Sequence, residues 1–230
     1  MSTEQRAPRI LIVQTGTAGA LVPAHGDYPD WFRRALGASE EQMPVLRTAP
    51  ELGGEKLDRE VLFRTKAKGV LVTGSPLSAA AKEGWMEELG EALLRAGQAG
   101  TPVLGVCFGH QLLGQSGGGE VARNPRGREI GTVQVQLTEA GRKDPLFSWA
   151  EASRIDVQAT HAEAVLPPPK RATLLASNEN CATQALRALI RSRAEQLRGE
   201  GLDPVGLEAS VRETDGRRIL RAFADQVWRA

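Results

Sequence analysis

A strand pattern and a helix pattern meet at one cysteine in Pro102-Val103-Leu104-Gly105-Val106-Cys107-Phe108-Gly109-His110-Gln111. The first half is a short apolar run typical of a buried strand of a parallel sheet, and the second half continues with helical character. Gly105 and Gly109 flank Cys107 two residues away on each side, and a tight strand-to-helix turn needs their missing Cβ atoms. We therefore predict a nucleophile elbow with Cys107 at its tip.

The position of Cys107 predicts a reactive thiol. The carboxyl end of a central strand is where open α/β sheets bind ligands, and the N-terminus of a helix favours the thiolate form of a cysteine. The competing interpretation is a small buried core cysteine, which is the usual fate of a free Cys and the one we expect for Cys181. A cysteine that attacks a carbonyl also needs oxyanion donors, for which the backbone N–H of Phe108 and the turn Thr73-Gly74-Ser75-Pro76 are the candidates.

Strands and helices alternate through the first half of the chain. Arg9–Val13 and Gly69–Val72 are apolar runs of strand length, while Asp30–Leu36 and Lys82–Ala96 have apolar residues at helical spacing. Such alternation is typical of a mostly parallel sheet covered by helices on both faces. We expect a three-layer α/β sandwich.

The second half has a different pattern. Glu129–Thr138 and Ser153–Gln158 alternate like exposed, antiparallel strands. From about residue 183 onward we expect helices: one over Thr183–Arg198, one that starts at Asp203-Pro204 with Asp203 as N-cap, and an amphipathic one over Ile219–Val227.

The composition excludes several classes of protein. The 230 residues include 29 basic and 28 acidic ones, for a net charge of +1, and only 4% are aromatic, so we expect no nucleic-acid or membrane partner. Two cysteines and three histidines without ligand spacing predict no metal, no cofactor and no disulfide framework. Met1–Pro8 lacks the apolar core of a signal peptide. We expect a single cytoplasmic domain over residues 1–230.

Several motifs together resemble the triad-type, or class I, glutamine amidotransferases, and the likeness is strongest to free-standing members similar to the GMP-synthase amidotransferase domain. The residues that carry the resemblance are Val72-Thr73-Gly74-Ser75-Pro76, Leu104–Leu113, Gly118–Pro125, Glu129-Ile130-Gly131-Thr132, Thr160–Pro167 and Leu175-Ala176-Ser177-Asn178. The resemblance implies a flavodoxin-like fold and a glutamine or γ-glutamyl substrate. It also implies a partner, a synthetase subunit, that accepts the ammonia.

The resemblance assigns roles to individual residues. Cys107 would attack the glutamine side-chain amide and form a γ-glutamyl thioester, which water then hydrolyses. Phe108, Gly74 and Ser75 would form the oxyanion hole, and Gln111 would help hold the substrate. Some relatives of this kind instead cleave γ-glutamyl peptides by the same acyl chemistry.

The chain departs from the family where the base and its orienting carboxylate belong. In the family a strand and turn of the form G-x-Q-F-H-P-E supply both, and we expect about two dozen residues of this region, judged by the family pattern, to be missing here. His161 and Glu163 are the candidate substitutes for the base and the orienting carboxylate, whereas His25 is expected in a solvated loop and His110 in the pocket lining. We therefore predict glutamine turnover far below that of an intact member. The alternatives are a non-catalytic relative that binds glutamine or a partner protein, a γ-glutamyl peptidase, and a redox protein with an oxidisable elbow thiolate.

Overall fold

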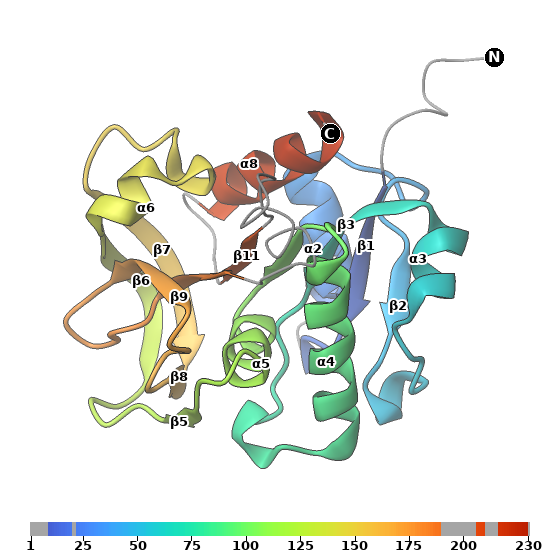
Figure 1. Cartoon of the computed structure of the whole chain (residues 1–230), viewed down its shortest axis with the longest axis horizontal. Coiled ribbons are helices and arrows are strands. Elements are labelled where there is room, and N and C mark those ends of the chain that lie inside the picture. Colours follow the sequence, from blue (N-terminus) through green and yellow to red (C-terminus); the bar gives the residue numbers. More distant parts are fainter. Residues whose placement is uncertain (1–8, 20–21, 190–205, 210–215, 230) are drawn as a thin grey trace, which may run out of the picture.

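One nine-stranded sheet organises the structure, a computed structural model that describes residues 9–19, 22–189, 206–209 and 216–229 (Figure 1). Its strand order is β2-β1-β3-β4-β11-β10-β9-β6-β7. The parallel strands are β1 (Arg9–Gln14), β2 (Val45–Arg47), β3 (Ala67–Val72), β4 (Val103–Gly105) and β11 (Gly206–Ala209). The antiparallel strands are β6 (Glu129–Leu137), β7 (Arg154–His161), β9 (Ala172–Ser177) and β10 (Ala185–Leu189).

Helices cover both faces of the parallel half. On one face lie α2 (Tyr28–Leu36) and α8 (Gly216–Arg229), and on the other lie α3 (Arg59–Thr65), α4 (Gly84–Gln98) and α5 (Phe108–Ser116). Side chains of β1 alternate between the two cores: Ile10 and Ile12 pack on the α8 side, Leu11 and Val13 on the α4 side. Because both faces are covered, β1 is an unbroken apolar run. The predicted three-layer sandwich is confirmed.

Shorter elements complete the structure. They are α1 (Val22–His25), α6 (Glu139–Lys143), the 3₁₀ turns Pro50–Leu52, Ala79–Ala81 and Pro145–Phe147, and a separate antiparallel pair of β5 (Val121–Arg123) with β8 (Glu163–Val165). In Figure 1 the antiparallel strands β6, β7 and β9 lie at the left, and α3 and α4 lie at the right. Within the described residues no helix is long and apolar enough to cross a membrane.

The predicted C-terminal helices are partly wrong. The final helix over Ile219–Val227 is confirmed as α8, but residues 185–189, expected within a helix, form β10. Strand β10 pairs with β9 on one side and β11 on the other, so backbone pairing outweighs the helical spacing of a short apolar segment. The rest of the helix predicted to residue 198 lies outside the described residues, and so does the predicted helix start at Asp203-Pro204. Residues 206–209, which that second helix would have included, form strand β11 instead.

Because one sheet collects strands from residue 9 to residue 209, we propose that the chain forms a single domain.

Candidate active site

The turn at Cys107 is a strained elbow. Cys107 has φ 53° and ψ −105°, a left-handed backbone that costs a non-glycine residue on the order of 1–3 kcal/mol. It stands between β4 and the first residue of α5. A Cβ on Gly105 would lie 2.4 Å from the carbonyl oxygen of Gly109, and a Cβ on Gly109 would lie 2.8 Å from Val72 O. Both flanking glycines are therefore required by close backbone packing, as their sequence positions predict.

The predicted oxyanion turn lies against the elbow. The amide of Gly109 donates to Thr73 O at 3.2 Å, which ties α5 to the turn after β3. A Cβ placed on Gly74 would lie 3.6 Å from Cys107 Cβ. Ser75 packs against Gly16, since a Cβ there would approach Ser75 Oγ to 2.4 Å. Gly74 thus adjoins the thiol-bearing residue, and the oxyanion role of this turn stays a prediction.

Two cavities meet at Cys107. An inner one of about 40 Å³ is lined by Cys107, His110, Gln111, His161 and Cys181, among others. An outer one of about 360 Å³ is lined by aromatic and apolar side chains together with the elbow, namely Tyr28, Trp31, Phe32, Leu220, Gly74 and Cys107. The thiol therefore lies between a small, partly polar chamber and a larger, mostly apolar recess.

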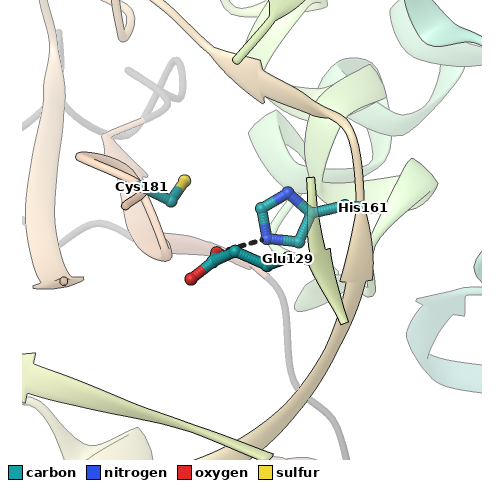
Figure 2. Close-up of side chains that lie close together, drawn as sticks. All are labelled: Glu129, His161 and Cys181. Atoms are coloured by element: carbon teal, nitrogen blue, oxygen red, sulfur yellow. Dashed lines mark ion pairs between the residues drawn. The ribbon is translucent and has the colours of Figure 1, made fainter. Parts of the chain in front are cut away.

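His161 faces a carboxylate other than the one predicted. Its Nδ1 lies 3.0 Å from the backbone oxygen of Glu163, and its Nε2 lies 2.9 Å from Glu129 Oε2 (Figure 2). The Glu163 carboxylate instead accepts a 2.5 Å hydrogen bond from Ser78 Oγ. The Glu163 carboxylate therefore does not orient His161 in this geometry. The carboxylate that lies next to the His161 ring is that of Glu129.

Glu129 is a buried carboxylate that the sequence reasoning missed. Its oxygens accept hydrogen bonds from Asn178 Nδ2 at 2.7 Å and from Gln184 Nε2 at 2.6 Å. A signal was present in the sequence: Glu129 shares the inward face of β6 with Val135 and Leu137, and a charged residue among buried apolar ones needs partners.

The other two histidines are poor bases for Cys107. His110 Nε2 lies 3.2 Å from Thr183 O, an acceptor, so Nε2 carries the proton. Burial above all, with an electrostatic effect of the nearby His161, lowers the pKa of His110 to about 4, although the hydrogen bond to Thr183 opposes the shift. His25 is exposed at the end of α1. His110 lines the inner cavity, as predicted.

Gln111 also lines the inner cavity. Its Nε2 donates to Glu163 O at 2.9 Å, the same oxygen that His161 Nδ1 contacts. This bond fixes α5 to β8 and sets the amide of Gln111 at the cavity wall. Its predicted contact with substrate stays a prediction.

The strand that sequence reasoning expected to be missing is present. Gly206–Ala209 forms β11 beside β4, with Ala209 opposite Gly105, so β11 ends at the sheet edge that bears Cys107. The expectation that this strand is missing is therefore wrong. The residues that follow β11 in the sequence are Ser210-Val211-Arg212, which offer no His where the family motif has H-P-E.

Comparisons with known proteins agree with this architecture. The profile of the family "Glutamine amidotransferase class-I" matches residues 34–192, more than half of the chain. The GMP synthase of Aeropyrum pernix is 37% identical over 62% of this chain and 24% of its own length. Gamma-glutamyl peptidase 3 of Arabidopsis thaliana is 28% identical over 77% of this chain and 70% of its own length. The chain thus spans about a quarter of that synthase and about two thirds of the peptidase.

Solved structures share the fold. A putative GMP synthase subunit from Thermoplasma acidophilum superposes with a TM-score of 0.69 at 18% identity, over 96% of this chain and 94% of that one. A glutamine amidotransferase from Thermotoga maritima gives a TM-score of 0.67 at 19% identity, over 97% of this chain and 99% of that one. With the elbow, the sheet order and the matched profile, the chain belongs to the class I glutamine amidotransferase family.

Proposed function

We propose that this chain transfers the γ-glutamyl group of glutamine, or of another γ-glutamyl amide, to Cys107. A bond forms between Cys107 Sγ and the γ-carbonyl carbon, the amide C–N bond breaks, and the leaving nitrogen takes the thiol proton. The observation that carries the proposal is the left-handed backbone of Cys107 between β4 and α5. The backbone N–H of Phe108 and the Gly74–Ser75 turn provide the oxyanion donors, and Gln111 contacts the substrate.

We also propose that turnover is slow. The three histidines of the chain are all described, and His161 has an acceptor beside each ring nitrogen while His110 has a pKa of about 4. A positioned base contributes typically about 10²–10⁴-fold to the rate. Acylation can pass the proton of Cys107 itself to the leaving nitrogen, whereas hydrolysis of the thioester needs a base that activates a water molecule. Deacylation therefore limits turnover, and the acyl-enzyme accumulates.

A second substrate class is favoured by the outer cavity. Its volume of about 360 Å³ and its aromatic wall of Tyr28, Trp31 and Phe32 suit a leaving amine larger and more apolar than ammonia. The similarity to a protein named gamma-glutamyl peptidase supports this candidate. A γ-glutamyl amide of an aromatic amine would then acylate Cys107 faster than glutamine does.

A synthetase subunit remains a proposed partner. The matched region accounts for only 24% of the Aeropyrum pernix GMP synthase, so that relative contains much sequence outside the match. If ammonia is delivered rather than released, a separate subunit would dock over the cavities at Cys107. Ammonia-dependent synthesis that becomes glutamine-dependent on addition of this chain would identify such a subunit.

Glutamate release tests the catalytic proposal. We expect slow release from glutamine by the wild type and none by Cys107→Ala, with far-UV circular dichroism to show that both are folded. His161→Ala tests whether His161 is the substitute base, since the substitution would lower the rate by about 10²-fold or more if it were. If neither the folded wild type nor folded Cys107→Ala released glutamate, the non-catalytic alternative would be favoured.

A further inference from the structure

Three potential metal ligands converge beside the inner cavity. Glu129 comes from β6, His161 from β7 and Cys181 from the loop before β10, and one ligand atom of each lies within 4.8 Å of the others (Figure 2). The side chains of Glu129 and His161 are 5% and 15% exposed, and Cys181 is 2% exposed. A carboxylate, an imidazole and a thiol thus share a site that water barely reaches.

The imidazole presents a lone pair to this site. Because the backbone oxygen of Glu163 can only accept, His161 Nδ1 must donate to it, which leaves Nε2 unprotonated in the neutral ring. Nε2 lies 2.9 Å from Glu129 Oε2, yet the two atoms lack hydrogen-bond geometry and Nε2 has no hydrogen-bond partner among the described residues. Two acceptors that face each other repel unless a cation lies between them.

A proton or a metal ion would satisfy this pair, and Cys181 favours the metal. A proton shared by His161 and Glu129 would not need the Cys181 thiol. A metal ion would, because the thiolate form of cysteine is a strong ligand for zinc-like ions. Asn178 Oδ1 accepts from the amide of Cys181 at 2.6 Å, and Asn178 N donates to Cys181 O at 2.9 Å. The loop that carries Cys181 is therefore tightly hydrogen-bonded, and its sulfur lies within 4.8 Å of the other two ligand atoms.

We propose that Glu129, His161 and Cys181 bind a Zn²⁺-type divalent metal ion. Bond lengths of about 2.0–2.3 Å place tetrahedral ligand atoms about 3.3–3.6 Å apart, so the three side chains need to shift by only about 1 Å. Thiolate, carboxylate and neutral imidazole together cancel the charge of the ion, which suits a buried site. The inner cavity of about 40 Å³ leaves room for a water molecule as the fourth ligand.

The surroundings support the ligands as they do in known metal sites. Metal-binding histidines usually donate their second ring N–H to a carbonyl or carboxylate, as His161 does to Glu163 O. Metal-binding carboxylates are usually hydrogen-bonded as well, and Asn178 and Gln184 each donate to one oxygen of Glu129. The site goes beyond the proposed function, since neither its ligands nor its metal take part in the acyl transfer to Cys107.

Metal binding must release a proton. A coordinating thiol is deprotonated. The affinity for metal therefore increases with pH.

Cobalt and zinc binding test the site, with Cys107→Ser as the matched control for Cys181→Ser. Equilibrium dialysis against Zn²⁺ under metal-free reductant should give one ion per chain for the wild type and Cys107→Ser. Cys181→Ser should bind about 100-fold more weakly, and Gln184→Ala about 10–100-fold more weakly. With Co²⁺, a thiolate charge-transfer band should appear in the wild type and Cys107→Ser but not in Cys181→Ser.

The proposal would be overturned by an absence of stoichiometric binding to the folded wild type, by equal loss of binding in both cysteine variants, or by undiminished binding to Cys181→Ser. Circular dichroism checks that each variant is folded. If Cys181→Ser does not fold, His161→Gln replaces it and must lose the bound metal. A His161→Gln variant that binds as tightly as the wild type would equally contradict the assignment. Because metal binding is measured without substrate, its failure and the failure of acyl transfer are distinguishable.

Discussion

The substitution Gly105→Ala should damage the elbow in a way that a glycine elsewhere does not. A Cβ on Gly105 would meet Gly109 O at 2.4 Å, Gly109 C at 2.5 Å and His110 N at 2.7 Å, all backbone atoms of the turn into α5. Ordinary contacts for such an atom start near 3.4 Å, so the backbone must move by about 1 Å. Forcing an extra carbon into packed structure costs about 1–3 kcal/mol.

The matched control is Gly84→Ala. Gly84 is the first residue of α4 and has an ordinary helical backbone, and a Cβ added there would meet no other atom within 4 Å. Alanine at this position should be neutral or should stabilise the fold by about 0.4–1 kcal/mol. Urea unfolding of both variants beside the wild type measures the two free energies. A Gly105→Ala variant within about 0.5 kcal/mol of the wild type would refute the close-packed elbow.

Three further predictions concern buried groups. His110→Gln should remove a pH dependence of the free energy of unfolding. The pKa of His110 is about 4 in the folded state and 6.5 in the unfolded state, so the unfolded state binds the proton first as the pH falls. Between these two values the wild type should therefore lose about 3 kcal/mol of stability in all. Only the wild type should show that loss in unfolding curves from pH 7 to pH 4. Asp144→Ala should destabilise the fold by about 3–5 kcal/mol in thermal or urea unfolding, because it removes the buried carboxylate that pairs with the guanidinium of Arg187, which is only 19% exposed. A change below about 1 kcal/mol would contradict this. Iodoacetamide should label Cys107 in the native protein and Cys181 only after unfolding, since Cys181 is 2% exposed and burial raises its pKa; peptide mapping with equal labelling of both would show otherwise.

Local sequence signals predicted the part of the fold that carries Cys107. The elbow depends on two glycines within four residues of each other, and β1 depends on an unbroken apolar run, so short stretches of sequence contain the necessary information. The same holds for α8, whose apolar residues Ile219, Leu220, Phe223 and Val227 are buried along one face.

Features that depend on distant pairing were missed. Leu186 and its neighbours are compatible with a helix or a strand by spacing alone, and only the pairing of β10 with β9 and β11 decides for the strand. Glu129 and His161 come together because β6 and β7 pair in register, with these two residues directly opposite. Cys181 joins them from a loop 20 residues further along the chain, and no sequence spacing announces such a cluster.

The chain therefore combines a well-formed nucleophile elbow with two nearby histidines, His161 and His110, that are not set up to act as the base for Cys107. His161 lies between Glu163 O and the Glu129 carboxylate, and His110 is held neutral by burial. This combination predicts acylation without efficient hydrolysis, which distinguishes the chain from both a fully active enzyme and an inert relative.

Intact-protein mass spectrometry after mixing with glutamine tests this account most directly, with a γ-glutamyl aromatic amide as a parallel substrate and Cys107→Ala as the control. We expect a mass increase of one glutamyl group on the wild type, located on the peptide that contains Cys107 and removed by hydroxylamine, and none on the variant. A folded wild type that acquires no adduct from either substrate and releases no glutamate would contradict acyl transfer to Cys107.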